Sequence, residues 1–527
     1  MKKTIISIIF CGVMLTSFGQ NFLDNISFEK GLKKAPSELY PHWKEQVIKN
    51  SETGHYIFRK EFSGTPGPGR MPKYRIEKYN NKLELENSYD FQAVKKGEKK
   101  NKRQEYAEFM FLNHDDLYLF SQVYMPKLRQ NHLYVQTVNK ETLQPNSDFK
   151  KIASLSYAKN TNFVYSKFTL NTSRDSSKFL IYPTYSKHEG RSEGGDMNLP
   201  LYVFDKNFTL LNETSIQLIP KTLQSYTVSN SGDITSYIYN HKKETYLIKC
   251  YFSDGKTQDY NIEEGKFISS LIVDSDNENI IISGLYSIND SRSLVKVGTG
   301  SFIIKINSKS KQIITEKYNE FDKDIITQYM TEKEHKTWST QTKKHKSQSL
   351  FGSNVSDIVI NNDGSTILII EENITRTTVS TNNAGSLNGP DAHSTHSSNH
   401  IIAIKRLANG DIDWITKIPK KQYGFDLSSY YHIMNNDNLY FIFNDNPKNT
   451  NYKEGNELAY FSRVNNKKDG IISIVQINKE GQQSKGVLYK AKEEEAPLMI
   501  IPSKSNKISN KVHSLKTKTQ FCKIIFN

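Results

Sequence analysis

Three histidines stand close together in a polar stretch of the chain, at positions where imidazole could bind a metal ion. The stretch reads DAHSTHSSNH over 391–400, so His393, His396 and His400 follow one another at intervals of three and four residues. Neutral imidazole is a common ligand of zinc, copper and nickel. The stretch has no large apolar residue to fix it against a core, so a solvated loop is the alternative to a metal site.

Acidic and amide side chains follow two long apolar runs, and they are candidates for binding a ligand. Glu371 and Glu372 follow the run STILII, and the run NLYFIF is followed by the polar set Asn444, Asp445, Asn446 and Asn449. Loops after neighbouring strands carry many of the binding residues of β proteins. Asn-Asp-Asn-Pro is also common in turns, so an ordinary turn is the alternative at the second run.

The acidic segment Asp274-Ser-Asp276-Asn-Glu278 has the spacing with which a calcium-binding loop begins. Such a loop needs glycine at the sixth place and a carboxylate at the twelfth, which is Leu285 here. We therefore expect a turn between strands. The chain also has no Walker loop and no H-E-x-x-H. The sequence identifies no cofactor, and it favours a binding role without deciding whether the protein is an enzyme.

The first residues have the pattern of a secretory signal peptide. Lys2 and Lys3 precede a mostly apolar run, and Ser17-Phe18-Gly19 supplies small residues at the two positions that signal peptidase reads. We expect residues 1–19 to be removed, with cleavage after Gln20 as the other option. The run is too short for a comfortable membrane span. We therefore expect an exported chain, periplasmic, on the outer surface or secreted, which is not transmembrane after cleavage.

Composition narrows the class of protein and the kind of partner. An aromatic content of 11% excludes a disordered chain, and 71 Lys and Arg against 56 Asp and Glu give 71 − 56 = +15. Basic runs at 95–103 and 343–346 are expected in loops, where they could contact an anionic surface of the envelope. No nucleic-acid partner is expected for an exported chain. Cys250 and Cys522 lie in apolar strand patterns, which favours two buried free thiols over a disulfide.

Two kinds of short unit recur along the chain and alternate strictly. One is a polar turn that leads into an aromatic or β-branched strand, as in HDDLYLF at 114–120, and the other is a hairpin, as in YRIEKYNNKLELE at 74–86. The turns of the first kind are marked by Asp115, Asp175, Gly232, Asp276, Asp363, Asp437 and Asn506, and those of the second by Asn80, Asn139, Asp205, Asp254, Asn307, Asn409 and Asn478. A repeat near 60 residues with about four strands predicts an all-β fold, a β-propeller.

We expect about seven four-stranded blades over residues 51–527, with six and eight as alternatives. The hairpin at the start and the turn and strand at the end would complete one blade, so that N- and C-terminal strands close the ring. Residues 20–50 are expected to precede the ring, with a short helix around Ser37 to Ile48. Two insertions are expected: 321–350, with a helical face made by Ile325, Ile326, Tyr329 and Met330, and 376–400, a flexible polar loop.

Four segments carry a resemblance to known sequences. They are LYVFDKNFTLLNE at 201–213, IAIKRLANGDIDWITKIPKKQY at 402–423, NLYFIFNDNPKN at 438–449 and SIVQINKEGQQ at 473–483. They resemble uncharacterised exported β-propeller-like proteins of Bacteroidetes-type bacteria, from about residue 160 onward. This resemblance implies a propeller fold and export and carries no catalytic residue across. GDIDW at 410–414 is similar to the strand ends of quinoprotein-type propeller repeats, in one copy.

These observations together predict an exported β-propeller that works as a binding or scaffold protein of the cell envelope. The ligand is an unidentified protein or glycan, and an anionic envelope surface is a further candidate partner. The alternative is a propeller enzyme, a hydrolase, a lyase or a quinoprotein-like oxidoreductase, with its site at the central channel. Propellers serve both roles, so the fold does not decide between them.

Overall fold

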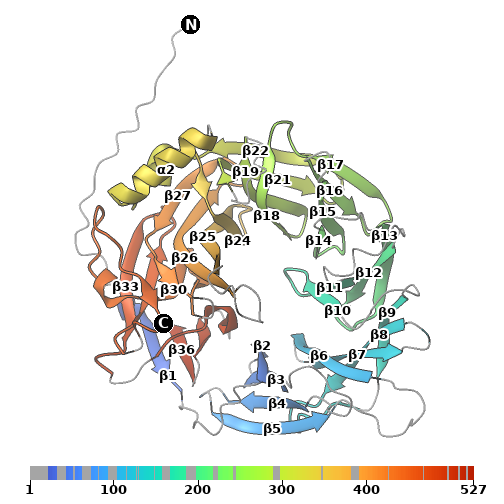
Figure 1. Ribbon diagram of the computed structural model, residues 1–527. Coiled ribbons are helices and arrows are strands. Elements are labelled where there is room, and N and C mark those ends of the chain that lie inside the picture. Colours follow the sequence, from blue (N-terminus) through green and yellow to red (C-terminus); the bar gives the residue numbers. More distant parts are fainter. Residues whose placement is uncertain are drawn as a thin grey trace.

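Short strands with apolar side chains on both faces form eight antiparallel sheets that stand around a ring as the blades of a propeller (Figure 1). The computed structural model describes residues 22–31, 43–51, 54–61, 73–80, 82, 84–92, 104–113, 116–125, 128, 130–146, 149–156, 167–184, 198–217, 224–240, 245–288, 297–345, 348–380, 391–424, 427–466, 468–494, 498–507, 511–517 and 520–527.

The first four blades are regular four-stranded sheets. Blade 1 contains β2 (Trp43–Ser51), β3 (Gly54–Glu61), β4 (Lys73–Tyr79) and β5 (Leu85–Gln92). Blade 2 contains β6 (Gln104–Asn113), β7 (Asp116–Met125), β8 (Gln130–Val138) and β9 (Lys150–Ser156). Blade 3 contains β10 (Lys167–Thr172), β11 (Lys178–Thr184), β12 (Asn198–Asp205) and β13 (Leu210–Gln217). Blade 4 contains β14 (Gln224–Val228), β15 (Ile234–Asn240), β16 (Thr245–Tyr251) and β17 (Thr257–Asn261).

The last four blades carry the additions. Blade 5 contains β18 (Phe267–Ser275), β19 (Asn279–Ser287), β21 (Gly300–Asn307) and β22 (Ile313–Glu320). Blade 6 contains β24 (Ser353–Ile360), β25 (Thr366–Ser380), β26 (Asp391–Arg406) and β27 (Ile412–Ile418). The short strand β28 (Gln422–Tyr423) also pairs with β26, and β31 (Phe461–Ser462) pairs with β28 in parallel. Blade 7 contains β29 (Tyr431–Asn435), β30 (Asn438–Asp445), β32 (Ile471–Ile477) and β33 (Gln483–Lys490). Blade 8 contains β34 (Asn506–Lys507), β35 (Val512–Lys516), β36 (Phe521–Phe526) and β1 (Ile26–Lys30).

Each blade runs outward from the axis, with its first strand nearest the ring centre and its fourth at the outside (Figure 1). Because successive strands are antiparallel, the turns after the first and third strands lie on one face of the ring, which we call the hairpin face. Except for Asn506, which lies in β34, the marked turn residues that the structure describes lie in or at the start of these turns, for example Asp363 between β24 and β25 and Asn478 between β32 and β33. The two alternating units are therefore the inner and outer hairpins of the blades.

Asx turns explain why Asp, Asn and Ser mark these positions. The side chain of Asp205 accepts from the backbone N–H groups of Asn207 at 2.9 Å and Thr209 at 2.8 Å. Asp276 accepts from the N–H of Glu278 at 2.8 Å and of Asn279 at 2.7 Å, which confirms a turn where a calcium loop was the alternative. Such local bonds stabilise a tight turn without any tertiary partner.

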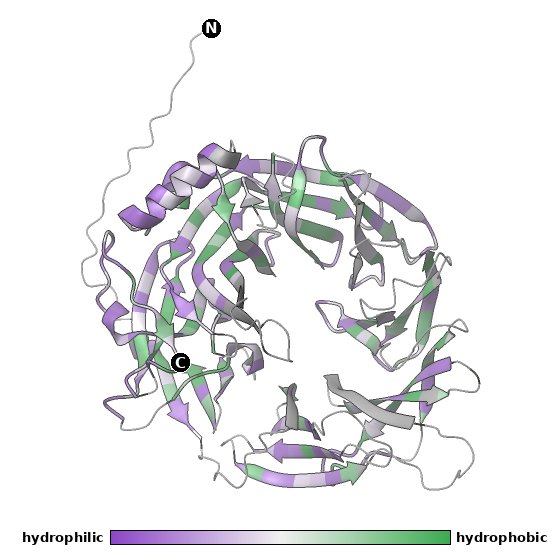
Figure 2. Cartoon of the chain, in the orientation of Figure 1, coloured by the Kyte–Doolittle hydropathy of each residue, from purple (hydrophilic) through white to green (hydrophobic). Residues whose placement is uncertain are grey.

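Apolar clusters between neighbouring blades form the core of the ring. One example lies between blades 6 and 7, where Ile369, Ile401, Phe441 and Val475 are buried together. Burying each such side chain contributes about 1.5–3 kcal/mol, which a single sheet exposed on both faces could not gain. Figure 2 shows the same pattern, with hydrophobic stretches inside the blades and a hydrophilic surface on the outer helix α2 (Glu332–His345).

The ring closes through the N-terminal strand. β1 pairs antiparallel with β36 in a register that runs from Ile26 opposite Phe526 to Lys30 opposite Cys522. The predicted closure of one blade by N- and C-terminal strands is thus confirmed. The number of blades is eight, which was an alternative to the expected seven. The seven-blade count joined the hairpin at 74–86 to the chain end, whereas that hairpin is β4 and β5 of a complete blade 1.

The short helix expected around Ser37 to Ile48 is wrong over its second part. Residues from Trp43 onward form β2, the innermost strand of blade 1, and residues 32–42 lie outside the described residues. Local sequence misled here because WKEQVIKN suits an amphipathic helix as well as a strand, and pairing with β3 (Gly54–Glu61) decides the outcome.

The insertion at 321–350 contains helical structure, as expected, in two pieces. α1 (Lys323–Thr327) and α2 follow blade 5, and Ile326 packs with Trp338 and Leu350 in one buried cluster. Lys343 therefore lies on a helix, not in the expected loop. The basic run at 95–103 lies outside the described residues. Among the described helices, none combines the length and the apolarity needed to cross a membrane.

The loop expected at 376–400 is in large part strand. β25 and β26 pair from Thr366 opposite Arg406 out to Ser380 opposite Asp391, so the hairpin extends well beyond the other strands of the blade. Residues 381–390 lie outside the described residues. Thr and Val over 375–379 have high β propensity, and backbone pairing rather than an apolar face extends the hairpin.

Cys250 and Cys522 are free and buried, as favoured from the sequence. Cys250 lies in blade 4 and Cys522 in blade 8. Burial raises the pKa of the Cys250 thiol to about 12 and that of Cys522 to about 11. Because the thiolate is the reactive form, both residues act as small apolar core residues.

Two buried histidines lie at the contacts of blade 8 with its neighbours, one at the contact with blade 1, which we call the seam, and one at the contact with blade 7. His55 of β3 stacks on Phe521 with 6.0 Å between ring centroids, and His513 of β35 meets the Tyr431 hydroxyl through Nδ1 at 3.0 Å. Burial lowers the pKa of each imidazole to about 4, with smaller contributions from Lys523 and Lys507.

These shifts predict that acid weakens the folded ring. A folded pKa below the unfolded one means that stability is complete above pH of about 6.5 and falls as the pH decreases toward 4, because only the unfolded chain takes up these protons. Between pH 7 and pH 5 each histidine should account for about 2 kcal/mol of the loss. Measured by urea unfolding, the free energy of unfolding of His55→Gln and of His513→Gln should fall less between pH 7 and pH 5 than that of the parent. The control His335→Gln, on α2, should lose as much as the parent. An unchanged pH dependence in both the His55→Gln and the His513→Gln variant would contradict the assignment.

Candidate functional site

The carboxylate of Glu371 is buried in blade 6, beside the bulge at which β25 and β26 change register. Lys420 Nζ donates to Glu371 Oε1 at 2.7 Å, and both side chains are shielded from water, with 0% and 4% exposed. The second oxygen, Oε2, accepts from Asn373 Nδ2 at 3.0 Å and from Ser429 Oγ at 2.9 Å. Every oxygen of this buried carboxylate therefore has a partner within the chain.

Lys420 extends this contact into a chain of hydrogen bonds. Its Nζ also donates to the Ser398 carbonyl at 3.1 Å and to Gln422 Oε1 at 2.9 Å. Burial lowers the pKa of Lys420, and the neighbouring Glu371 carboxylate acts in the opposite direction. Gln422 Nε2 then donates to the Asn444 carbonyl at 2.7 Å, which connects blade 6 to blade 7.

Asn444 carries the connection on to blade 8. Its amide donates to the carbonyls of Leu427 at 2.9 Å and Ile500 at 2.8 Å, and its Oδ1 accepts from the Ile500 N–H at 2.9 Å. The segment that contains Ile500 leads into β34. We call the set from Glu371 through Lys420 and Gln422 to Asn444 the inter-blade network.

A second network surrounds Asp445. Its Oδ2 accepts from Lys485 Nζ at 2.7 Å and from Ser473 Oγ at 3.1 Å, and its Oδ1 accepts from Asn449 Nδ2 at 2.8 Å. Asn446 begins the short 3-10 helix η5 (Pro447–Asn449), where its side chain accepts from the Lys448 N–H. The turn chemistry that was the alternative for this segment is present.

The structure thus brings most of the predicted binding residues together, and their polar groups are already hydrogen-bonded within the chain. Glu371, Asn444, Asp445 and Asn449 lie in the two networks, and each is bonded to groups of the chain itself. Glu372 lies outside them and pairs with the buried Lys417 at 3.3 Å. A ligand-binding role for this set stays a prediction. Sequence reasoning missed the lysines that pair with these carboxylates. Three lysines close together, at 417, 420 and 421 around the end of an apolar strand, are a signal of such buried pairs.

The three histidines all lie in β26, where an extended strand separates them. A strand rises about 3.3 Å per residue, so His393 and His400 are spaced roughly 20 Å apart along it. His396 contacts Thr375 Oγ1 at 3.1 Å and Ser398 Oγ at 3.2 Å. Burial lowers the pKa of His400 well below its usual value, and its ring lies beside Tyr329.

This arrangement does not favour one shared metal ion. The side chain of His393 lies outside the described residues, and the metal site therefore stays a prediction. Among the side chains that are described, no group of three or more His, Cys, Asp or Glu could hold a metal ion.

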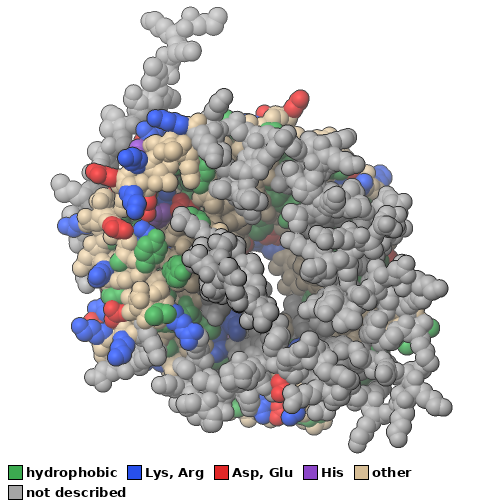
Figure 3. All heavy atoms as spheres, viewed as in Figure 1, with side chains coloured by type: hydrophobic (Ala, Val, Ile, Leu, Met, Phe, Trp, Pro, Cys, Tyr) green, Lys and Arg blue, Asp and Glu red, His purple; other side chains and the backbone are tan. Residues whose placement is uncertain are grey.

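Charged residues near the axis form a feature that sequence reasoning missed. Arg174, in the inner turn of blade 3, reaches across to Asp274 Oδ2 of blade 5 at 2.7 Å and to the Ile360 carbonyl of blade 6 at 3.0 Å. His432 of blade 7 faces Asp357 of blade 6, with 3.4 Å between Nε2 and Oδ2. These residues are far apart in sequence, so only the packing of the blades around the axis brings them together. Figure 3 shows that an opening remains at the ring centre.

The His432–Asp357 pair could support proton transfer, but its surroundings are those of a charge pair. Burial lowers the pKa of His432, and the Asp357 carboxylate opposes that effect. The neighbouring Ser356 hydroxyl is bonded to Tyr430 and to the Ile369 carbonyl. Within the described chain, no hydroxyl or thiol is hydrogen-bonded to the His432 ring.

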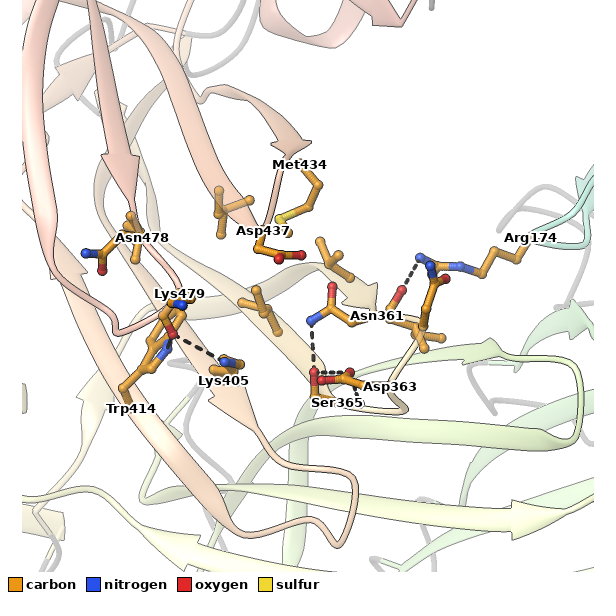
Figure 4. A pocket seen from close by; sticks show the side chains of 16 residues that line it. Arg174, Asn361, Asp363, Ser365, Lys405, Trp414, Met434, Asp437, Asn478 and Lys479 are labelled. Carbon is orange, nitrogen blue, oxygen red and sulfur yellow. Dashed lines mark hydrogen bonds between the residues drawn. The ribbon is translucent and has the colours of Figure 1, made fainter. Parts of the chain in front are cut away.

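A cavity of about 540 Å³ opens between blades 6 and 7 on the hairpin face (Figure 4). Its buried wall is aliphatic and includes Ile367, Leu439 and Ile477. The turn that carries Asn361 and Ser365 lies across it from Met434 and Asp437, and Arg174 enters from the side of the axis. The cavity therefore extends from the axis outward to Trp414.

Trp414 is held firmly at the outer end of this cavity. Its Nε1 donates to the Lys479 carbonyl at 2.9 Å. Gly481 approaches the ring so closely that an added Cβ would lie 2.6 Å from Trp414 Cγ, and its φ of +82° also favours glycine. One side of the indole is therefore already covered by backbone.

The buried pair of Glu371 and Lys420 predicts a specific pattern of stability. Glu371→Gln leaves a buried ammonium without its counter-charge and should cost about 3–5 kcal/mol in urea unfolding. The double variant with Lys420→Met removes both charges, so its loss should be smaller than the sum of the two single losses. Lys479→Met, at an exposed position, is the control. A Glu371→Gln variant as stable as the parent would show that the Glu371–Lys420 pair does not stabilise the fold.

No family model matches the chain, and no curated protein matches it. Solved structures do, at low identity. The WD40 domain of SCAP from fission yeast is 8% identical, with 95% of this chain and 98% of that one covered, at a TM-score of 0.37. The β-propeller domain of the Trilobed protease from Pyrococcus furiosus is 10% identical, with 72% and 93% covered, at a TM-score of 0.33.

A third similar structure is prolyl oligopeptidase B from Galerina marginata. It is 10% identical, with 90% of this chain and 55% of that one covered, at a TM-score of 0.38. Likenesses at these identities and TM-scores carry no inference about this chain. The strand order and the closed ring identify the chain as an eight-bladed β-propeller.

Proposed function

We propose that this chain is an exported β-propeller that serves as a binding or scaffold module of the cell envelope. Export rests on the signal-peptide pattern of residues 1–19 and cleavage before Gln20 or Asn21. The binding role rests on the distribution of charge inside the ring.

The observation that carries the proposal is the mutual pairing of interior charges. Glu371 is paired with Lys420, Asp445 with Lys485 and Asp274 with Arg174, each with a contact of 2.7 Å. Carboxylates held in such pairs are fixed in position by their partners, which suits a rigid frame better than general acid or base catalysis. A rigid ring that presents loops on two faces is well suited to binding.

A propeller enzyme with a site at the central channel is the second candidate. The observation in its favour is the His432–Asp357 pair, which lies on the innermost strands of blades 7 and 6. The two side chains are 25% and 44% exposed, so they are accessible to a molecule in the channel. A nucleophile would have to come from water or from the substrate.

One screen separates the two functions. The purified mature chain is applied to peptide and glycan arrays, bound molecules are eluted, and the same protein sample is analysed for metals. The proposal predicts that a bound molecule is recovered chemically intact, and that His432→Ala retains the binding. Conversion of the molecule to a product by the parent but not by His432→Ala would overturn the proposal in favour of the enzyme. Asp357→Asn is the matched variant for the same pair.

Export makes a separate prediction. When the full chain is produced in a Gram-negative host, the mature protein should be found outside the cytoplasm, and N-terminal sequencing should begin at Gln20 or Asn21. Replacing Lys2 and Lys3 by glutamate should retain the precursor in the cytoplasm, because the positive residues direct the signal to the export machinery. A cytoplasmic chain that keeps Met1 would contradict export.

A further inference from the structure

The cavity between blades 6 and 7 has a lining that points to one class of ligand. Because an inserted side chain buries apolar surface, the aliphatic wall made by Ile367, Leu439 and Ile477 favours an aliphatic group over a sugar ring. Sugar rings stack on aromatic faces, and the lining has one aromatic ring, Trp414, with one side covered by Gly481. Met434 adds an adaptable side chain at the mouth.

The polar rim of the cavity is close to electrically neutral, although the chain as a whole carries +15. Arg174 and Lys405 line it, but each already has a carboxylate partner, Asp274 at 2.7 Å and Asp413 at 2.9 Å. Lys479 then supplies one positive group, and Asp363 and Asp437 supply two negative ones. A rim with both signs suits a neutral dipolar ligand and gives no selectivity for an anionic polymer.

Two of these rim groups are available for a ligand. The side chains of Asn362 and Asp437 are exposed and make no hydrogen bond or ion pair with any described residue. Asp437 lies beside Met434 and faces the cavity in Figure 4. A carboxylate accepts from backbone N–H groups, and an amide both donates to and accepts from a peptide backbone. By contrast, Asn361, Asp363 and Ser365 are bonded to one another in their turn.

From these features we infer that the cavity binds a neutral peptide segment that inserts an aliphatic side chain between blades 6 and 7. This inference rests on the proposed binding function and names the class of partner and the place. The cavity volume of about 540 Å³ is within the usual range for a small ligand or one side chain with its flanking backbone. The segment would lie from the axis near Arg174 toward Trp414.

The test uses the mature chain labelled with ¹³C at its methionine methyl groups, with Met434→Leu to assign the Met434 signal. N-acetyl-L-leucine methylamide is the probe, and N-acetylglycine methylamide and maltose are the comparisons. The Met434 signal should shift and saturate with the leucine probe and should not move with the other two. Asp437→Asn should weaken binding about tenfold through loss of a charge-assisted bond, and Glu480→Gln, outside the lining, should leave it unchanged.

Asp437→Asn is a suitable variant because residue 437 has a φ of +60°, which asparagine adopts readily. A shift with maltose, or equal shifts with the leucine and glycine probes, would overturn the inference. So would a Met434 signal that no probe moves. In that last case, an intact ligand recovered from the array screen would keep the binding function and reject only this cavity as its place.

Discussion

The pairing of β1 with β36 is the interaction on which the remaining structure depends. Blades in a propeller gain stability by covering their neighbours, so the last blade must meet the first. β1 completes blade 8 from the outside, and its pairing is continued by Gly31, whose N–H donates to the Phe521 carbonyl at 2.9 Å. Because the chain passes from β1 directly into blade 1, the pairing ties the two ends of the ring.

The seam needs this tie because its apolar contact is small. Among the described residues, the cluster between blades 8 and 1 consists of Ile57, Tyr79 and Phe521, whereas that between blades 7 and 8 includes Tyr440, Ile474 and many others. Hydrophobic burial alone therefore holds blade 8 to blade 7 more strongly than to blade 1. The covalent passage from β1 to β2 compensates, and the stacking of His55 on Phe521 adds to the apolar contact.

Charge pairing plays a comparable role between blades 6, 7 and 8. Glu371, Lys420, Gln422 and Asn444 join three blades through side chains that would be costly to bury singly. Their geometry explains why polar residues after apolar strands need not form an open binding site. The cavity on the hairpin face is the better-supported place for a ligand, because the side chains of Asp437 and Asn362 make no bond with any described residue.

Much of the fold could be predicted from the sequence because turns are local. Asp205 and Asp276 bond to backbone groups within four residues, so the alternating hairpins are visible in any stretch of chain. β2 was missed because its identity depends on pairing with β3. The Arg174–Asp274 and Glu371–Lys420 pairs were missed because residues 49 to 100 positions apart meet only in the tertiary structure.

Closure can be measured by residue-resolved hydrogen exchange of the mature chain and of a chain that lacks residues 20–31. If β1 closes the ring, the amides of β36 that face β1 lose their protection in the shortened chain, and protection also falls in β2 to β5 of blade 1. The strands of blades 4 and 5, opposite the seam, should exchange more nearly as in the parent. Unchanged protection of β36 and blade 1 without β1 would contradict the central claim that the N-terminal strand holds the eight blades in one ring.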